Sequence, residues 1–82
     1  MEKHDFKLVG LGKPNSATLE HLHTDKDTFW ATIDMPQNKI DELWLLCKNN
    51  WDDVKIAEVV CDRVTSDGVP INAKLVGIRF NN

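Results

Sequence analysis

Hydrophobic and polar residues alternate along much of the first 35 positions, which is the pattern of half-buried β-strands. The clearest case is a run in which Phe29, Ala31 and Ile33 alternate with Trp30 and with polar residues. The alternation places Trp30 on the face opposite the core. Three strands are predicted in this part of the chain: Phe6–Leu11, Thr18–His23 and Thr28–Met35.

A loop at positions 24–27 predicts that the second and third of these strands form a hairpin. Pairing across that loop places Leu19 opposite Ile33 and His21 opposite Ala31. The same register places Leu22 opposite Trp30.

One helix is predicted, from Gln37 to about Asn50. Pro36 is suited to a position at or just before the helix start, and Asn49-Asn50 to a C-terminal stop, because Asn tolerates the left-handed cap conformation. At 100° per residue the apolar side chains gather on one face, which consists of Ile40, Leu43, Trp44, Cys47 and Trp51. Leu45 points away from that face, so we expect it to be exposed.

The last third of the chain, from Val54 to Phe80, predicts a long β-hairpin. The dipeptide Asp67-Gly68 is favoured in a two-residue type I′ turn, and such a turn fixes which residues face each other. The resulting register is Val64 with Ile71, Val60 with Leu75, Val59 with Val76 and Ala57 with Ile78. Because the apolar face changes sides along the hairpin, we expect a coil or a β-bulge near Gly77.

These elements predict a single α+β domain spanning residues 1–82. The expected architecture is a curved antiparallel sheet or partial barrel of about five strands with one packed helix, in the order β-β-β-α-β-β.

Composition narrows the class of protein. The 82 residues carry 13 acidic and 10 basic side chains, a net charge of −3, and the basic residues are dispersed. This balance does not favour long-range attraction to phosphate. Apolar runs are too short to span a membrane or to form a signal peptide, and two cysteines suit a reducing compartment, so we expect a cytoplasmic protein.

No complete catalytic or cofactor motif is found, so we predict neither an enzyme nor a cofactor. The segment Gly10-Leu11-Gly12-Lys13 lacks the spacing of a phosphate-binding loop, because four residues should separate the glycines. His21 and His23 share one face of a predicted strand and could supply half of a metal site. The alternative is a pair of partly exposed strand histidines.

The segment from Ala57 to Arg79 resembles the closing hairpin of the oligonucleotide-binding domain of ATP-dependent DNA ligases. The shared features are a strand ending in Glu-Val, a Thr-x-Asp-Gly turn and a returning Gly-x-Arg. The segment covers under a third of the chain. The Arg-His-Pro that follows the turn in that family is replaced by Pro70-Ile71-Asn72, and the chain has no adenylation motif. The resemblance implies a curved β framework.

Two functions of different classes remain. In the first, a non-catalytic domain binds and modulates a partner protein, such as a basic or nucleic-acid-handling protein, through Trp30, Leu45 and Leu22. Exposed aromatic residues supply much of the energy of such interfaces. A homodimer formed through a free strand edge is a further possibility under this hypothesis.

The alternative function is the binding of single-stranded nucleic acid on an oligonucleotide-binding-like barrel. Trp30 would stack on a base, and Lys55, Arg63 and Lys74 would contact phosphates.

Overall fold

The computed structural model describes residues 1–13, 15–22, 27–50 and 52–80. His23, predicted to belong to a metal half-site, and Trp51, predicted to lie on the helix face, are outside these ranges. The elements along the chain are β1 (Glu2–Gly12), β2 (Ser16–Glu20), β3 (Thr28–Ile33), α1 (Gln37–Asn49), β4 (Lys55–Cys61), β5 (Arg63–Val64), β6 (Pro70–Ile71) and β7 (Lys74–Phe80).

Five strands close into a barrel in the order β1-β2-β3-β7-β4. The long strand β1 joins two sides of the barrel, since its first half pairs with β4 and its second half with β2. The contact that closes the barrel is a short parallel pairing of β3 with β7. The predicted α+β class with one helix is therefore confirmed. The sheet is mixed rather than antiparallel, because β7, which pairs with β3, follows α1 and β4 in the chain and runs parallel to β3.

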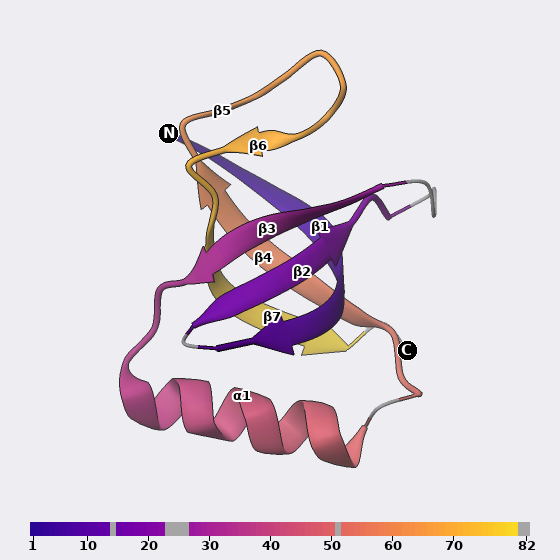
Figure 1. Cartoon of the computed structure of the whole chain (residues 1–82), viewed down its shortest axis with the longest axis vertical. Helices are drawn as coiled ribbons and strands as arrows, with labels where there is room; N and C mark the ends of the chain where they lie inside the picture. Colours follow the sequence, from indigo (N-terminus) through magenta and orange to yellow (C-terminus); the bar gives the residue numbers. More distant parts are fainter. Residues whose placement is uncertain (14, 23–26, 51, 81–82) are drawn as a thin grey trace.

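The helix α1 lies across one end of the barrel, and the short two-stranded arm β5–β6 projects from the opposite end (Figure 1). A five-stranded Greek-key barrel with a helix between its third and fourth strands is the topology of oligonucleotide- and oligosaccharide-binding folds.

Alternation along the strands fills the barrel. In β3 the side chains of Phe29, Ala31 and Ile33 are buried and the side chains between them are exposed, as predicted. The helix adds Ile40, Leu43 and Cys47 from its predicted apolar face. The core is completed by Phe6, Leu8, Ala17, Leu19, Ala57, Val59, Ala73 and Leu75.

Both ends of α1 follow from their neighbouring residues. The carbonyl of Pro36 accepts the backbone N–H groups of Lys39 and Ile40, at 2.9 and 3.0 Å, so the helix begins where predicted. At the other end, α1 stops at Asn49, as predicted, but Asn50 does not adopt the left-handed conformation, since its φ is −128°. The side-chain amide of Asn50 instead donates to the carbonyl of Leu46 at 2.9 Å.

The predicted register of the first hairpin is wrong by four residues. Leu19 pairs with Phe29 rather than with Ile33, and Trp30 pairs with Thr18 rather than with Leu22. A shift by an even number leaves every side chain on the same face of the sheet, so the alternation of residue types does not distinguish the two registers. Leu22 follows the end of β2 instead of lying beside Trp30.

The predicted two-residue turn at Asp67-Gly68 is also wrong. The N–H of Gly68 donates to the carbonyl of Thr65 at 2.9 Å, and Gly68 has a φ of +83°. Together with the bond from the Thr65 N–H to the carbonyl of Val69, this makes a three-residue loop that ends in a left-handed glycine.

The longer loop moves the hairpin register by one residue near the turn. Val59 therefore pairs with Leu75, and both side chains are buried. A β-bulge after Glu58 leaves Val76 unpaired and restores the predicted pairing of Ala57 with Ile78. The expected bulge near Gly77 is confirmed.

Candidate functional site

The outer face of the β1–β2–β3 sheet carries one large exposed aromatic side chain. Trp30 is 66% exposed, although the residues on either side of it in β3 are buried. Its outward direction is therefore set by the alternation of the strand, and the prediction that Trp30 faces away from the core is confirmed.

Small side chains surround the Trp30 indole on this face. Thr18 is its cross-strand partner, and Gly10 pairs with Thr18 on the next strand. A Cβ atom placed on Gly12 would lie 3.8 Å from Cζ3 of Trp30, so the indole leans diagonally over Gly12. Thr32 follows two residues later in β3 and is exposed on the same side. We call this set (Trp30, Gly10, Gly12, Thr18 and Thr32) the Trp30 face.

The cation nearest to the Trp30 face in the sheet register belongs to Lys74. Lys74 pairs with Thr32 across the parallel contact, and its side chain is exposed. On the other side of the face, Lys7 and Glu20 lie 3.9 Å apart and balance one another. The Trp30 face therefore combines a flat aromatic ring and hydroxyl groups with the neighbouring positive charge of Lys74.

Several acidic side chains of the barrel lie on other strands and are already paired. Arg79 on β7 contacts Asp5 and Glu58, and Lys3 lies 3.8 Å from Glu58. The hydrogen bond from Arg79 holds the pKa of the Asp5 carboxyl below its usual value. These two acids are thus held on the β1–β4–β7 side, away from the Trp30 face.

Lys55, which was predicted to contact phosphate, has a structural position instead. Only 6% of the residue is exposed. Its ammonium group donates to the carbonyls of Asn50 and Asp53, at 3.0 and 2.8 Å, and so holds the connection between α1 and β4. This corrects the predicted basic cluster, from which Arg63 on β5 and Lys74 remain exposed.

His21 covers the end of the barrel core rather than standing on an open face. The centre of its ring lies 5.2 Å from that of Phe29 and 6.2 Å from that of Phe6. The turn of the β5–β6 arm lies against it, because a Cβ on Gly68 would be 2.8 Å from Cε1 of His21. Within the described ranges, no group of three or more metal-ligating side chains is found.

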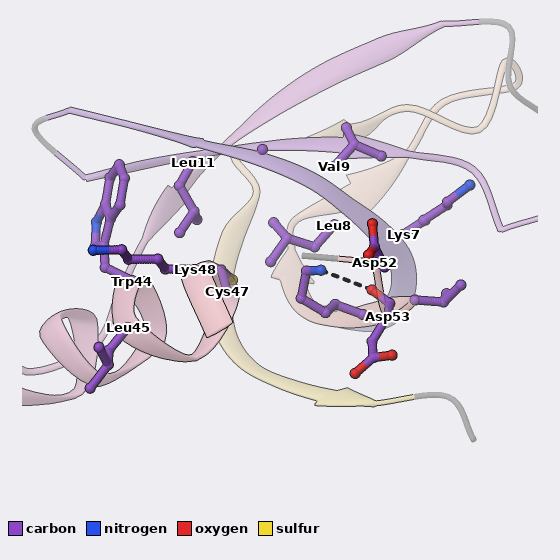
Figure 2. A pocket seen from close by; sticks show the side chains of 13 residues that line it. Lys7, Leu8, Val9, Leu11, Trp44, Leu45, Cys47, Lys48, Asp52 and Asp53 are labelled. Carbon is purple, nitrogen blue, oxygen red and sulfur yellow. Dashed lines mark hydrogen bonds between the residues drawn. The ribbon is translucent and has the colours of Figure 1, made fainter. Parts of the chain in front are cut away.

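Leu45 and its surroundings form a second surface, separate from the Trp30 face. Leu45 is 59% exposed, as predicted, and its neighbour Leu46 is 38% exposed. A groove of about 1000 Å³ separates α1 from the second half of β1, and we call it the α1–β1 groove. Figure 2 shows Trp44 and Lys48 rising from α1 beside Leu11 of β1. A smaller groove of about 470 Å³ lies on the other side of α1, against Ile78.

The three residues predicted to form one binding patch are therefore not brought together. Leu45 lines both grooves beside α1, whereas Trp30 lines neither. Leu22, 40% exposed, follows β2 near the end of the barrel that carries the arm. Alternation and helical spacing predict which side chains are exposed, but only the packing of α1 on the barrel decides which of them are neighbours.

Two features of these surfaces were not predicted from the sequence: the glycines and threonines beside Trp30, and the groove between Trp44 and Leu11. The small side chains could have been found from the strand pattern together with the correct hairpin register. The groove depends on how β1 bends past α1, for which the sequence contains no local signal.

Both cysteine side chains are buried. Burial raises the pKa of the Cys47 thiol and of the Cys61 thiol above the usual value, so both are protonated at neutral pH. The helix α1 is too short and too polar to cross a membrane, and no other helix is found in the described ranges.

Comparisons of the chain with protein-family models, with curated proteins and with solved structures give no significant match.

Proposed function

We propose that the chain binds single-stranded nucleic acid on the Trp30 face, with the Trp30 indole stacking on a base. The observation that carries this proposal is a 66% exposed tryptophan in the middle of an outer sheet face, surrounded by small side chains. Base stacking on such a ring contributes roughly 1–3 kcal/mol per base and tolerates any sequence, because every base has a π face.

The barrel topology supports this assignment. Oligonucleotide-binding folds use the outer face of their second and third strands, together with the loops beside it. Here that face is formed by β2 and β3, and the β5–β6 arm corresponds to one of those loops. The small residues beside the indole leave both the ring and the neighbouring hydroxyl groups of Thr18 and Thr32 accessible to a ligand.

Charge supports a weak electrostatic contribution rather than a dominant one. Lys74 beside Thr32, and Arg63 on the arm, would contact phosphates. Because the chain as a whole carries a net charge of −3, we expect few released counterions and a shallow dependence of affinity on salt.

The test is a fluorescence anisotropy titration of the protein into labelled oligothymidine at low and moderate salt. The expected result is saturable binding that quenches tryptophan fluorescence and is weakened by Trp30→Ala. Leu45→Ala is the matched control, because Leu45 is similarly exposed but lies on α1. Absence of binding at low salt, or equal binding by Trp30→Ala, would contradict the proposal.

A second candidate function, the binding of a partner protein, is favoured by the surface around Leu45. This surface combines two exposed leucines with a groove on either side of α1. Amphipathic helices commonly bind in such grooves through side chains spaced three or four residues apart.

A further inference from the structure

One flank of α1, along the α1–β1 groove, carries an aromatic, an aliphatic and two charged side chains. Asp41, Trp44, Leu45 and Lys48 recur every three or four residues, so they lie along the same flank of the helix. Trp44, Leu45 and Lys48 line the groove directly. We call these four residues the α1 flank.

The α1 flank is complementary to itself when it is turned around. In two antiparallel copies of α1 related by a twofold axis between positions 44 and 45, Trp44 of one copy faces Leu45 of the other. In the same arrangement Asp41 of each copy faces Lys48 of the other. Both apolar contacts and both ion pairs are thus satisfied by one symmetric, isologous interface.

We propose that the α1–β1 groove is a homodimer interface, in which the α1 helix of a second copy packs antiparallel along the α1 flank. Leu45 of the second copy would enter the groove beside Trp44 and Leu11. The proposal rests on the second candidate function for its site and identifies the partner as another copy of this chain. It leaves the Trp30 face of both copies open.

The charge pair offers a test that separates contacts between copies from contacts within one helix. Asp41 and Lys48 are seven residues apart, about 10.5 Å along the helix axis, so they do not pair within the same chain. Reversing either charge places like charges at both ends of the interface. Mixing the two reversed variants would restore opposite charges at both ends.

The experiment is sedimentation equilibrium of the purified chain from low micromolar to submillimolar concentration. We expect reversible dimerisation that Leu45→Glu abolishes and Leu46→Glu leaves nearly unchanged. Leu46 is the matched control, because it is exposed on the same helix but points away from the α1–β1 groove. Circular dichroism of each variant verifies that α1 is still folded.

Asp41→Lys and Lys48→Glu should each weaken dimerisation by about tenfold, because two exposed ion pairs become repulsive. An equimolar mixture of these two variants should dimerise at least as tightly as the original chain. A chain that stays monomeric throughout, greater sensitivity to Leu46→Glu than to Leu45→Glu, or a mixture no tighter than its components would each overturn the proposal.

Binding of oligothymidine by the monomeric Leu45→Glu variant distinguishes this proposal from the proposed function. The variant should still bind oligothymidine through Trp30. Loss of dimerisation with oligonucleotide binding intact is the expected result, and failure of either activity is detected independently of the other.

Discussion

The Trp30 face and the α1 flank differ in how their exposed apolar side chains are surrounded. Trp30 stands alone on a sheet face made of glycine and threonine, so its ring is accessible from above. Leu45 instead stands between two grooves and next to another exposed leucine. A flat, isolated ring is suited to stacking on a planar ligand, whereas a leucine beside a groove is suited to packing against a helix.

Two lysines of the barrel, Lys55 and Lys74, show a contrast of another kind. Lys55 is buried at the start of β4 and donates to backbone carbonyls, whereas Lys74 is exposed beside the Trp30 face. The sequence alone gives both residues the same role, since each is a lysine in a β-rich segment. The structure separates a cation that maintains the fold from a cation that is available to a ligand.

The largest expected effect on binding comes from removing the indole. Trp30→Ala should weaken oligothymidine binding by about 5- to 150-fold, which corresponds to the roughly 1–3 kcal/mol of one stacked base. Because the side chain is mostly exposed, the midpoint of thermal unfolding should change little. Anisotropy titrations and thermal melts of the same preparations measure the two effects. If Trp30→Ala bound oligothymidine as tightly as the original chain, or lost much of its stability, Trp30 would not be an exposed stacking residue and would not differ from Leu45 in the proposed way.

Lys55→Ala should have the opposite signature. It removes the hydrogen bonds that the ammonium donates to the carbonyls of Asn50 and Asp53 and leaves these carbonyls without that donor. We expect a loss of about 1–3 kcal/mol in the free energy of unfolding, measured by urea denaturation. The folded variant should bind oligothymidine like the original chain. If Lys55→Ala bound oligothymidine more weakly without losing stability, Lys55 would contact the ligand rather than maintain the fold.

Lys74→Gln should produce a smaller change, confined to binding. Loss of one phosphate contact lowers the slope of log affinity against log salt concentration by about one. Arg79→Gln is the control, because Arg79 is already paired with Asp5 and Glu58. If both substitutions changed the slope equally, the basic charge at the Trp30 face would not be specific to Lys74.

The smallest expected effect concerns Asp5 and its dependence on pH. Hydrogen bonding to Arg79 lowers the pKa of Asp5 in the folded state, so this contact stabilises the fold above the ordinary value near 3.8. The stabilisation is lost as the pH falls through the lowered value. Asp5→Asn should therefore lower the melting temperature slightly at neutral pH, by about 2 °C, and the difference should vanish in acid. If Asp5→Asn and the original chain still differed in melting temperature in acid, the difference would come from packing rather than from the charge of Asp5.

Local patterns in the sequence were sufficient to predict most of the elements and the direction of most side chains. Alternation predicted that Trp30 faces outward, and the 3.6-residue period predicted the buried face of α1 and the exposure of Leu45. Both properties depend on side chains a few residues apart. A short segment of the sequence is therefore enough to predict them.

The features that the sequence did not predict depend on contacts between residues far apart in the chain, or on small differences in turn geometry and strand register. The four-residue error in the first hairpin preserved the inward and outward faces, so no local pattern opposed it. The Asp67-Gly68 turn has one more loop residue than expected, which moved Val59 opposite Leu75. The burial of Lys55 and the separation of Trp30 from Leu45 follow from how α1 packs on the closed barrel.

The most direct test of the central claim is an NMR titration of ¹⁵N-labelled protein with oligothymidine at low salt. The assignment of the nucleic-acid site to the Trp30 face predicts that the indole N–H of Trp30 and the amides of Thr18 and Thr32 shift and saturate together. The amides of Leu45 and Lys48 should stay in place. No shift at any ratio, or shifts confined to α1, would contradict the account.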